Sequence, residues 1–387
     1  MPGWELIDER EKQALNAIFE ESNGVMFAHG FDGLRNGRYR VREFESALCN
    51  KFGFKNALAT TSGTMAQYIA MKALDIGPGD EVITQAFTFV ATVETIIELG
   101  ATPVIVDVDD SYNMCPKALS QAVTPKTKLV IPVHMLGNPC DMVEINKIAK
   151  KNSIKVMEDG CEAFGAKYEN QWVGGFSDIS IFSFDFAKTI TTGEGGVIFT
   201  QDQELDRRMR EFHDHGHENN PTLPRGLDSR SSYGLNLRMS ELQAAVGMAQ
   251  LDKLDFIISS NKERKNAFLD QILPSGNGYR FRKLHSVDEL SDTIILQVES
   301  KLKLKNIVKY LNTLGPGTKN LPDAIDWHFS GTWSHMFENS AANFNYRTKW
   351  KKTETLLRSS VSIPVLCKKS VEEYREYGRE IGKILSN

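Results

Sequence analysis

The stretch Asp178–Thr200 holds a single lysine, Lys188, between two short apolar strands. The sequence TTGEGG follows the lysine, and its glycines suit a tight chain reversal where side chains with a Cβ are disfavoured. A lysine on a constrained turn between buried strands loses solvation. We therefore expect its pKa to fall, so that the free amine can attack a carbonyl and form a Schiff base. The alternative is a surface lysine on a glycine-rich hairpin.

Three further features lie where they can meet this lysine. The turn Ser62-Gly63-Thr64 follows a predicted strand and begins a predicted helix, whose first backbone N–H groups would bind an anion, with Gly63 allowing close approach. Asp159 directly follows another predicted strand, and Phe87-Thr88-Phe89 forms an aromatic turn. Pyridoxal phosphate requires this combination: donors for its phosphate, an aromatic face for its ring, a carboxylate for its pyridinium nitrogen and a lysine for its aldehyde.

The pattern of elements explains how these features are brought together. Apolar runs alternate with amphipathic helical patterns along the first two thirds of the chain, which predicts an α/β fold with a mostly parallel sheet flanked by helices. In such sheets ligands bind beyond the carboxyl ends of the strands, where all of these groups lie. We expect strands at 58–61, 81–84, 103–108, 129–133, 154–157, 179–184 and 197–199, and helices at 5–21, 42–52, 90–99, 142–151 and 203–212.

The chain has 387 residues, enough for two domains. We predict a large cofactor-binding α/β domain over residues 1–255, with an N-terminal segment that is free to pack on the second domain. From about residue 256 the pattern changes to a smaller C-terminal α+β domain, with a strand at 293–298 and helices at 304–313 and 371–385.

Composition excludes several function classes. The net charge of −4 favours neither nucleic acid nor an anionic membrane, and no apolar run approaches membrane-spanning length. The five cysteines are scattered, with no CxxC pair, which predicts free thiols and a cytoplasmic protein. His213, His215 and His217 lack a second ligand cluster, so we expect no metal site. A Rossmann oxidoreductase is not favoured, because no G-x-G-x-x-G follows a strand.

About half of the chain resembles a known family. The stretches that carry the resemblance are TTSGTMAQ (60–67), QAFTFVATVETI (85–96), IPVHMLGNPCDM (131–142), VMEDGCEAFGA (156–166), IFSFDFAKTITTGEGG (181–196) and YGLNLRMSELQAAVGMAQL (233–251). They are similar to the DegT-type sugar aminotransferases, which have the type I fold of pyridoxal-phosphate enzymes. The resemblance implies pyridoxal 5'-phosphate as cofactor and a homodimer with shared active sites.

The resemblance also implies residue roles. Lys188 would carry the cofactor and shuttle the proton, Asp159 would pair with the pyridine nitrogen, and Phe89 would stack on the ring. The remaining ligands it implies bind the phosphate, the last of them across the subunit interface: Gly63, Thr64, Ser183 and Asn236.

The chain departs from the family pattern in three places. Glu162 stands beside the cofactor's phenolic oxygen, where glutamine is usual, and a carboxylate there repels a phenolate unless it is protonated or paired. The arginine-containing loop Gly30–Arg42 is longer than usual. Finally, the substrate region reads Asp326–Trp333, with His328, instead of ending in an aromatic-Pro-Leu-His signature.

These observations favour an aminotransferase that moves an amino group from L-glutamate to a keto or aldehydo sugar. Within the family the resemblance favours 8-amino-3,8-dideoxy-octulosonate, for lipopolysaccharide biosynthesis, as the product. Arg35, Arg38 and their neighbours Arg40 and Arg42 would suit the carboxylate of such a free acidic sugar, which adds weak support. The alternatives are a nucleotide-linked 4-keto or 3-keto sugar aminotransferase, a sugar dehydratase using Glu162, and a regulator or scaffold that keeps the fold without turnover. Two interpretations of the arginine-containing loop Gly30–Arg42 stay open: a clamp for a substrate carboxylate or phosphate, or a solvated basic loop.

Overall fold

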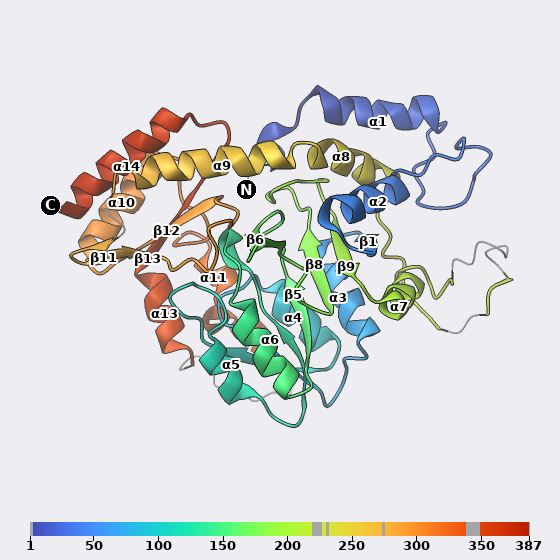
Figure 1. The fold of residues 1–387 in the computed structure, drawn as a ribbon, viewed down its shortest axis with the longest axis horizontal. Helices are drawn as coiled ribbons and strands as arrows, with labels where there is room; N and C mark the ends of the chain where they lie inside the picture. The colour runs from blue at the N-terminus through green and yellow to red at the C-terminus, as the bar shows by residue number, and fades with distance from the viewer. Residues whose placement is uncertain (1–2, 219–226, 230–231, 273–274, 338–348, 387) are drawn as a thin grey trace.

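We describe the protein from a computed structural model covering residues 3–218, 227–229, 232–272, 275–337 and 349–386. The sequence also predicts a polar loop rich in Asn, Pro, Arg and Ser at 218–232, and part of it lies outside the described residues. Figure 1 shows a central sheet covered by helices, with a second, smaller sheet at the C-terminal end of the chain.

The central sheet has seven strands in the order β1-β9-β8-β5-β4-β2-β3. All neighbours are parallel except those of β9, which runs antiparallel to both β1 and β8. The mostly parallel α/β sheet expected from the sequence is therefore confirmed. Its strands are β1 (Asn56–Thr60), β2 (Glu81–Gln85), β3 (Thr102–Val106), β4 (Thr127–Ile131), β5 (Lys155–Asp159), β8 (Ile179–Ser183) and β9 (Gly196–Thr200).

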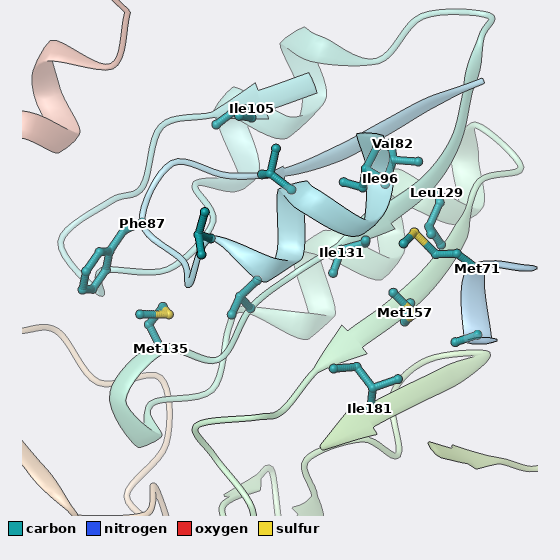
Figure 2. Packing of buried hydrophobic residues seen from close by; sticks show 14 of the residues in the cluster. Met71, Val82, Phe87, Ile96, Ile105, Leu129, Ile131, Met135, Met157 and Ile181 are labelled. Carbon is teal, nitrogen blue, oxygen red and sulfur yellow. The ribbon is translucent and has the colours of Figure 1, made fainter. Parts of the chain in front are cut away.

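Helices cover both faces of this sheet because alternate strand residues point to opposite faces. Val82, Leu129 and Met157 pack with α3 and α4 (Figure 2), whereas the adjacent Ile83 and Val130 pack with α5 and α6. The helices of these layers are α3 (Gly63–Ala73), α4 (Ala91–Glu98), α5 (Pro116–Ala122), α6 (Met142–Lys151) and α7 (Gln203–His213). A strand buried on both faces carries adjacent apolar residues in place of a strict alternation, as Val82-Ile83 and Leu129-Val130 do.

The second sheet is antiparallel, in the order β10-β11-β12-β13, and packs against helices from the same end of the chain. Helix α9 begins beside the large sheet and ends against α14, so it joins the two parts (Figure 1). The elements are β10 (Ser275–Gly276), β11 (Tyr279–Phe281), β12 (Thr293–Val298), β13 (Ser360–Pro364), α9 (Leu254–Leu269), α10 (Lys301–Leu314), α13 (Lys351–Arg358) and α14 (Val371–Ser386). The boundary at 255/256 stays a prediction.

The N-terminal segment contacts both parts. Lys253 binds Glu11 at 2.5 Å, which ties α1 to the end of α8, and the buried carboxylate of Glu5 accepts a hydrogen bond from the Cys367 N–H at 2.8 Å. The remaining elements are η1 (Gly3–Leu6), α1 (Glu9–Glu21), α2 (Arg40–Phe52), η2 (Met135–Gly137), β6 (Lys167–Tyr168), β7 (Gln171–Trp172), α8 (Glu241–Leu251), α11 (Ile325–His328), η4 (Ser330–Thr332) and α12 (Ser334–Phe337).

Candidate active site

The β1–α3 turn lies directly against the β8–β9 hairpin. A Cβ on Gly63 would lie 2.7 Å from the Cβ of Ser183, and a Cβ on Gly196 would lie 2.5 Å from the Ser62 carbonyl oxygen. Real side chains do not approach this closely, so both positions require glycine. This contact brings the start of α3 beside the end of β8, as the sequence predicted.

The start of α3 has the properties of an anion site. Ser62 is the N-cap, and its Oγ accepts a hydrogen bond from the Met65 N–H at 3.2 Å. The first N–H groups of a helix, here those of Gly63 and Thr64, have no partner within the helix and carry a partial positive charge. Ser183 lies beside them, its hydroxyl accepting from the Asp185 N–H at 3.2 Å. A phosphate fits this donor set.

Asp159 ends β5 and is buried. Its two carboxylate oxygens accept hydrogen bonds from the Cys161 N–H and the Thr92 hydroxyl, each at 3.1 Å. Burial raises the pKa of Asp159 above its ordinary value, opposed by these hydrogen bonds and by the nearby Lys188. A buried carboxylate of this kind suits a partner that supplies a proton or a positive charge, such as a ring nitrogen.

Lys188 lies on the loop between β8 and β9, and its side chain is 16% exposed. Burial lowers the pKa of Lys188, but Glu162, Cys161, Asp185 and Asp159 raise it, and the net shift is upward. The expectation that desolvation would depress this pKa is therefore wrong. The sequence pattern identified the buried turn but did not indicate that a carboxylate comes within reach of the amine.

That carboxylate is Glu162. Its Oε1 lies 3.8 Å from the Lys188 Nζ, and its Oε2 accepts a hydrogen bond from the Leu136 N–H at 3.0 Å. Burial raises the pKa of Glu162, but Lys188, Lys319 and His328 lower it more, so the net shift is downward. The structure thus answers the question posed by the sequence: Glu162 is paired, and ionisation is favoured.

The turn that supplies the Leu136 N–H has an unusual backbone. Leu136 is buried and left-handed, with φ 52° and ψ 46°, a conformation that costs a residue with a side chain about 1–2 kcal/mol. The following Gly137 also has positive φ, and a Cβ there would lie 2.7 Å from Asp292 Oδ1. Strain of this kind persists where the surrounding contacts hold it, and it is frequent at active sites.

The rings of Phe89 and His328 lie side by side, and His328 is near enough to Lys188 to feel its charge. Their ring centroids are 5.5 Å apart, and Phe89 exposes 45% of its surface. The His328 Nδ1 bonds the Ala324 carbonyl at 2.8 Å, so the ring is held in place. Burial lowers the pKa of His328, Glu162 raises it, and Lys188 and Lys319 lower it further. His328 thus lies close enough to Glu162, Lys188 and Lys319 for their charges to influence its pKa. Its predicted contact with the substrate stays a prediction.

The other predicted ligands lie elsewhere. Arg35 is fully buried, and its guanidinium is 2.9 Å from Glu241. The Arg38 side chain is 53% exposed, within 3.8 Å of Glu21. Asn236 is exposed and forms a bridge with Asp214, on a segment that also pairs with the start of the β1–α3 turn. Their predicted roles stay predictions.

Several residues of the site were not predicted from the sequence. Thr92 binds Asp159, Leu136 binds Glu162, and Lys319 influences both Glu162 and His328. Thr92 and Leu136 lie within family-like stretches, which was the only available signal. Lys319 lies far along the chain and carries no local signal.

Other expected features can be located. Within the described ranges no group of three His, Cys, Asp or Glu side chains is arranged to hold a metal ion. All five cysteines are free thiols. No helix among the described residues has the length and apolar character needed to cross a membrane.

The fold and the site define a class: a protein with the type I fold of pyridoxal-phosphate enzymes, with a lysine on the β8–β9 loop and the start of α3 packed against the same hairpin. The chain belongs to the DegT/DnrJ/EryC1/StrS aminotransferase family, whose sequence model matches residues 20–376. This membership, together with the donor set described above, confirms the expectation of pyridoxal 5'-phosphate as cofactor.

Individual relatives agree with the family. The chain is 39% identical to GDP-perosamine synthase of Caulobacter vibrioides over 64% of its length and 65% of the relative's. It is 40% identical to UDP-N-acetyl-3-dehydro-alpha-D-glucosamine 3-aminotransferase of Acidithiobacillus ferrooxidans over 55% and 56% of the two lengths. The matches thus span less than two thirds of these relatives. The crystal structure of the aminotransferase from Psychrobacter cryohalolentis is 27% identical, with a TM-score of 0.87 and 99% of both chains covered.

Proposed function

We propose that the protein is a pyridoxal-phosphate-dependent aminotransferase that transfers an amino group from L-glutamate to a keto group of a nucleotide-linked sugar. The observation that carries the proposal is the convergence of Lys188, Asp159 and the α3 start around one site, with Phe89 beside it. Family membership supports the same reaction class.

The residues divide the work as follows. The cofactor supplies an electron sink for the amino group's α-carbon when it is bound. The start of α3 and Ser183 would hold the phosphate, and Asp159 would favour a proton on the ring nitrogen. Lys188 would carry the cofactor, and its amine would move the proton during transfer. Glu162, 3.8 Å from the Lys188 Nζ, favours the protonated state of that amine.

A nucleotide-linked acceptor is favoured over the free acidic octulosonate. Both curated relatives described above carry a nucleotide-linked sugar in their names. The arginines that suggested an acidic sugar have other partners: Arg35 binds Glu241, Arg40 binds Glu21 and Glu43, and Arg42 stacks on Tyr39. Retention of Lys188 weighs against the dehydratase alternative, because the dehydratase branch that the chain resembles at Glu162 has histidine in place of this lysine.

We further propose a homodimer with shared sites, in the cytoplasm. Exposed apolar side chains gather on the segment before α2 and near Asn236: Met26, Phe27, Phe31, Leu34, Tyr233 and Leu235. Arg238 lies over the Phe27 ring at 5.1 Å, which links the two segments into one surface. An apolar surface of this kind beside a site is typical of an interface.

The absorbance spectrum of the purified protein tests this function. Bound cofactor gives a visible absorbance band. L-glutamate should convert the cofactor to its amino form and remove this band, and the true acceptor should restore the band. GDP- and UDP-linked keto sugars are compared with the free octulosonate that carries an aldehyde at C8. Restoration by the octulosonate alone would reject the nucleotide-sugar proposal, and absence of any cofactor band would reject the reaction class.

A further inference from the structure

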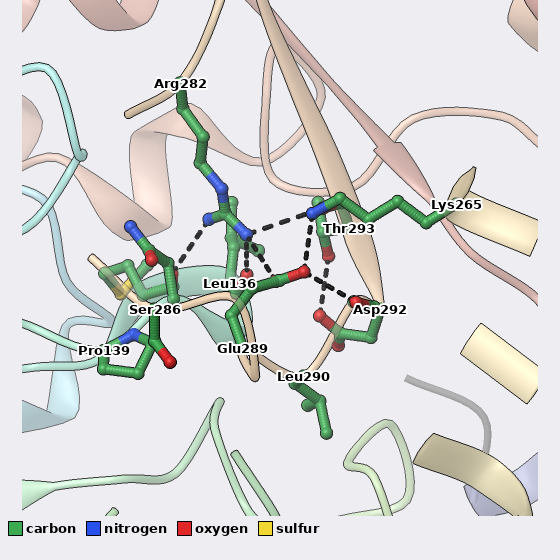
Figure 3. A network of polar contacts seen from close by, with 12 residues as sticks. Leu136, Pro139, Lys265, Arg282, Ser286, Glu289, Leu290, Asp292 and Thr293 are labelled. Atoms are coloured by element: carbon green, nitrogen blue, oxygen red, sulfur yellow. Dashed lines mark hydrogen bonds and ion pairs between the residues drawn. The ribbon is translucent and has the colours of Figure 1, made fainter. Parts of the chain in front are cut away.

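Arg282 lies in the second part of the chain, directly after β11, and its side chain is only 2% exposed. Its guanidinium donates to the Met135 carbonyl at 3.2 Å and to the Leu136 carbonyl at 2.6 Å (Figure 3). A buried arginine that binds two successive carbonyls of a turn 146 residues away fixes that turn more firmly than apolar packing would.

The turn in question supplies the hydrogen bond to Glu162. The Met135 carbonyl and the Leu136 N–H belong to the same planar peptide unit and point in opposite directions. Arg282 holds the carbonyl side of this unit, and the Glu162 Oε2 accepts from its N–H side at 3.0 Å. A rotation of this peptide would relax the left-handed Leu136 and would turn the N–H away from Glu162.

We propose that Arg282 is a positioning residue for the reaction: it holds the Met135–Leu136 peptide so that the Leu136 N–H keeps Glu162 beside Lys188. The role rests on the function proposed above. It extends across both parts of the chain, because Glu162 and Lys188 lie on loops that follow strands β5 and β8 of the large sheet, whereas Arg282 directly follows β11 of the small one.

The surroundings of Arg282 support a dedicated role. Glu289 lies 3.4 Å from the guanidinium, and Lys265 lies 2.7 Å from the other oxygen of Glu289 (Figure 3). The Leu290 N–H donates to the Gly137 carbonyl at 3.0 Å, so the same segment holds the turn at a second point. This buried network keeps Arg282 oriented, with Glu289 and Asp292 the acids that act on its charge most strongly and Glu162 acting on it less.

The charged groups around the amine define what the experiment should detect. Glu162, Cys161, Asp185 and Asp159 act on Lys188, and Lys319, His328 and the charge of Arg282 itself act on Glu162, so Arg282→Lys, which keeps that charge, isolates the hydrogen bonds to the turn. Displacing Glu162 removes the acid that most strongly raises the pKa of Lys188. The pH at which the bound cofactor changes its absorbance should then fall.

The test uses the holoenzyme with Arg282→Met, and Arg280→Met as the matched control. Arg280 lies two residues earlier, on β11, but its side chain is half exposed and contacts Gln297 and Asp110. Arg282→Met is expected to lower the absorbance midpoint by about 1 pH unit, as for an opposite charge displaced from contact distance. Arg280→Met should leave the midpoint unchanged, and Arg282→Lys, which can hold one carbonyl, should give an intermediate shift and serves if the methionine variant does not fold.

Two further measurements separate positioning from general stability. In a Glu162→Gln background Arg282→Met should cause no additional shift; an equal shift there would overturn the proposal. Hydrogen exchange in the cofactor-free protein should show the Leu136 amide exchanging at least about 10-fold faster in Arg282→Met. Unchanged exchange would also overturn the proposal, and this readout is independent of whether the aminotransferase function is correct.

Discussion

The Nζ of Lys188 lies 3.8 Å from the Oε1 of Glu162, and the two side chains are 16% and 6% exposed. At this separation and burial each charge strongly favours the ionised state of the other. The pair explains both why the pKa of Lys188 is raised, against the effect of burial, and why the pKa of Glu162 is lowered. Glu162, at a position where glutamine is usual in the resembling family, therefore acts as the counter-charge of Lys188.

Replacing Lys188 with alanine should reduce turnover by on the order of 10⁴-fold or more, because the cofactor's carrier and proton shuttle are lost. The fold should be retained, because the carboxylate of Glu162 still accepts a hydrogen bond from the Leu136 N–H and still interacts with the charges of Lys319 and His328. Steady-state kinetics and circular dichroism measure the two effects. Near-normal turnover in the variant would contradict the assigned role.

Replacing Glu162 with glutamine should destabilise the protein at neutral pH by roughly 3 kcal/mol, because a buried Lys188 loses its partner. The folded-state pKa of Glu162 is lowered, so its contribution is present above the unfolded value of about 4.3 and is lost as the pH falls through the lower folded value. Denaturant unfolding should therefore show the wild type and the variant converging in acid. The exposed Glu169, replaced with glutamine, is the control and should show no such difference.

Replacing Asp159 with asparagine should weaken catalysis but stabilise the cofactor-free protein. Burial raises the pKa of Asp159 in the folded protein. Ionisation of this carboxylate therefore lowers the free energy of unfolding once the pH rises above the pKa of aspartate in the unfolded chain. Asparagine keeps the shape and can still bond Cys161 and Thr92. Thermal unfolding should show an advantage of the variant that grows as the pH rises from acid to neutral; a lower melting temperature at pH 7 would contradict this account.

Replacing Gly63 with alanine should weaken cofactor binding and destabilise the fold by about 1–3 kcal/mol, because the new Cβ meets Ser183 at 2.7 Å. Gly77, near the other end of α3, is the matched control, because its Cβ would have only one neighbour, at 4.0 Å. Cofactor titration followed by absorbance should show a higher Kd in Gly63→Ala alone. Equal effects of the two substitutions would argue against the close contact at the β1–α3 turn.

Much of the fold was predictable, because its signals are local. Strand β12 and helix α6 have the predicted bounds, since an apolar run or an amphipathic pattern bounded by breakers specifies each. Helix α5 and strand β13 were not predicted. Helix α5 is only seven residues long, with one buried side chain, Leu119, so its amphipathic pattern is too short to detect.

The sequence by itself determined which groups stand at strand and helix ends: Lys188 on its glycine-rich turn, Asp159 after β5 and the anion-binding start of α3. These positions follow from spacing along a parallel sheet. Only the tertiary structure decided the charge state of the site. The Glu162–Lys188 ion pair, and the hold of Arg282 on the Leu136 turn, depend on contacts between segments far apart in sequence, because side-chain distance and burial, not residue type, determine electrostatic energies.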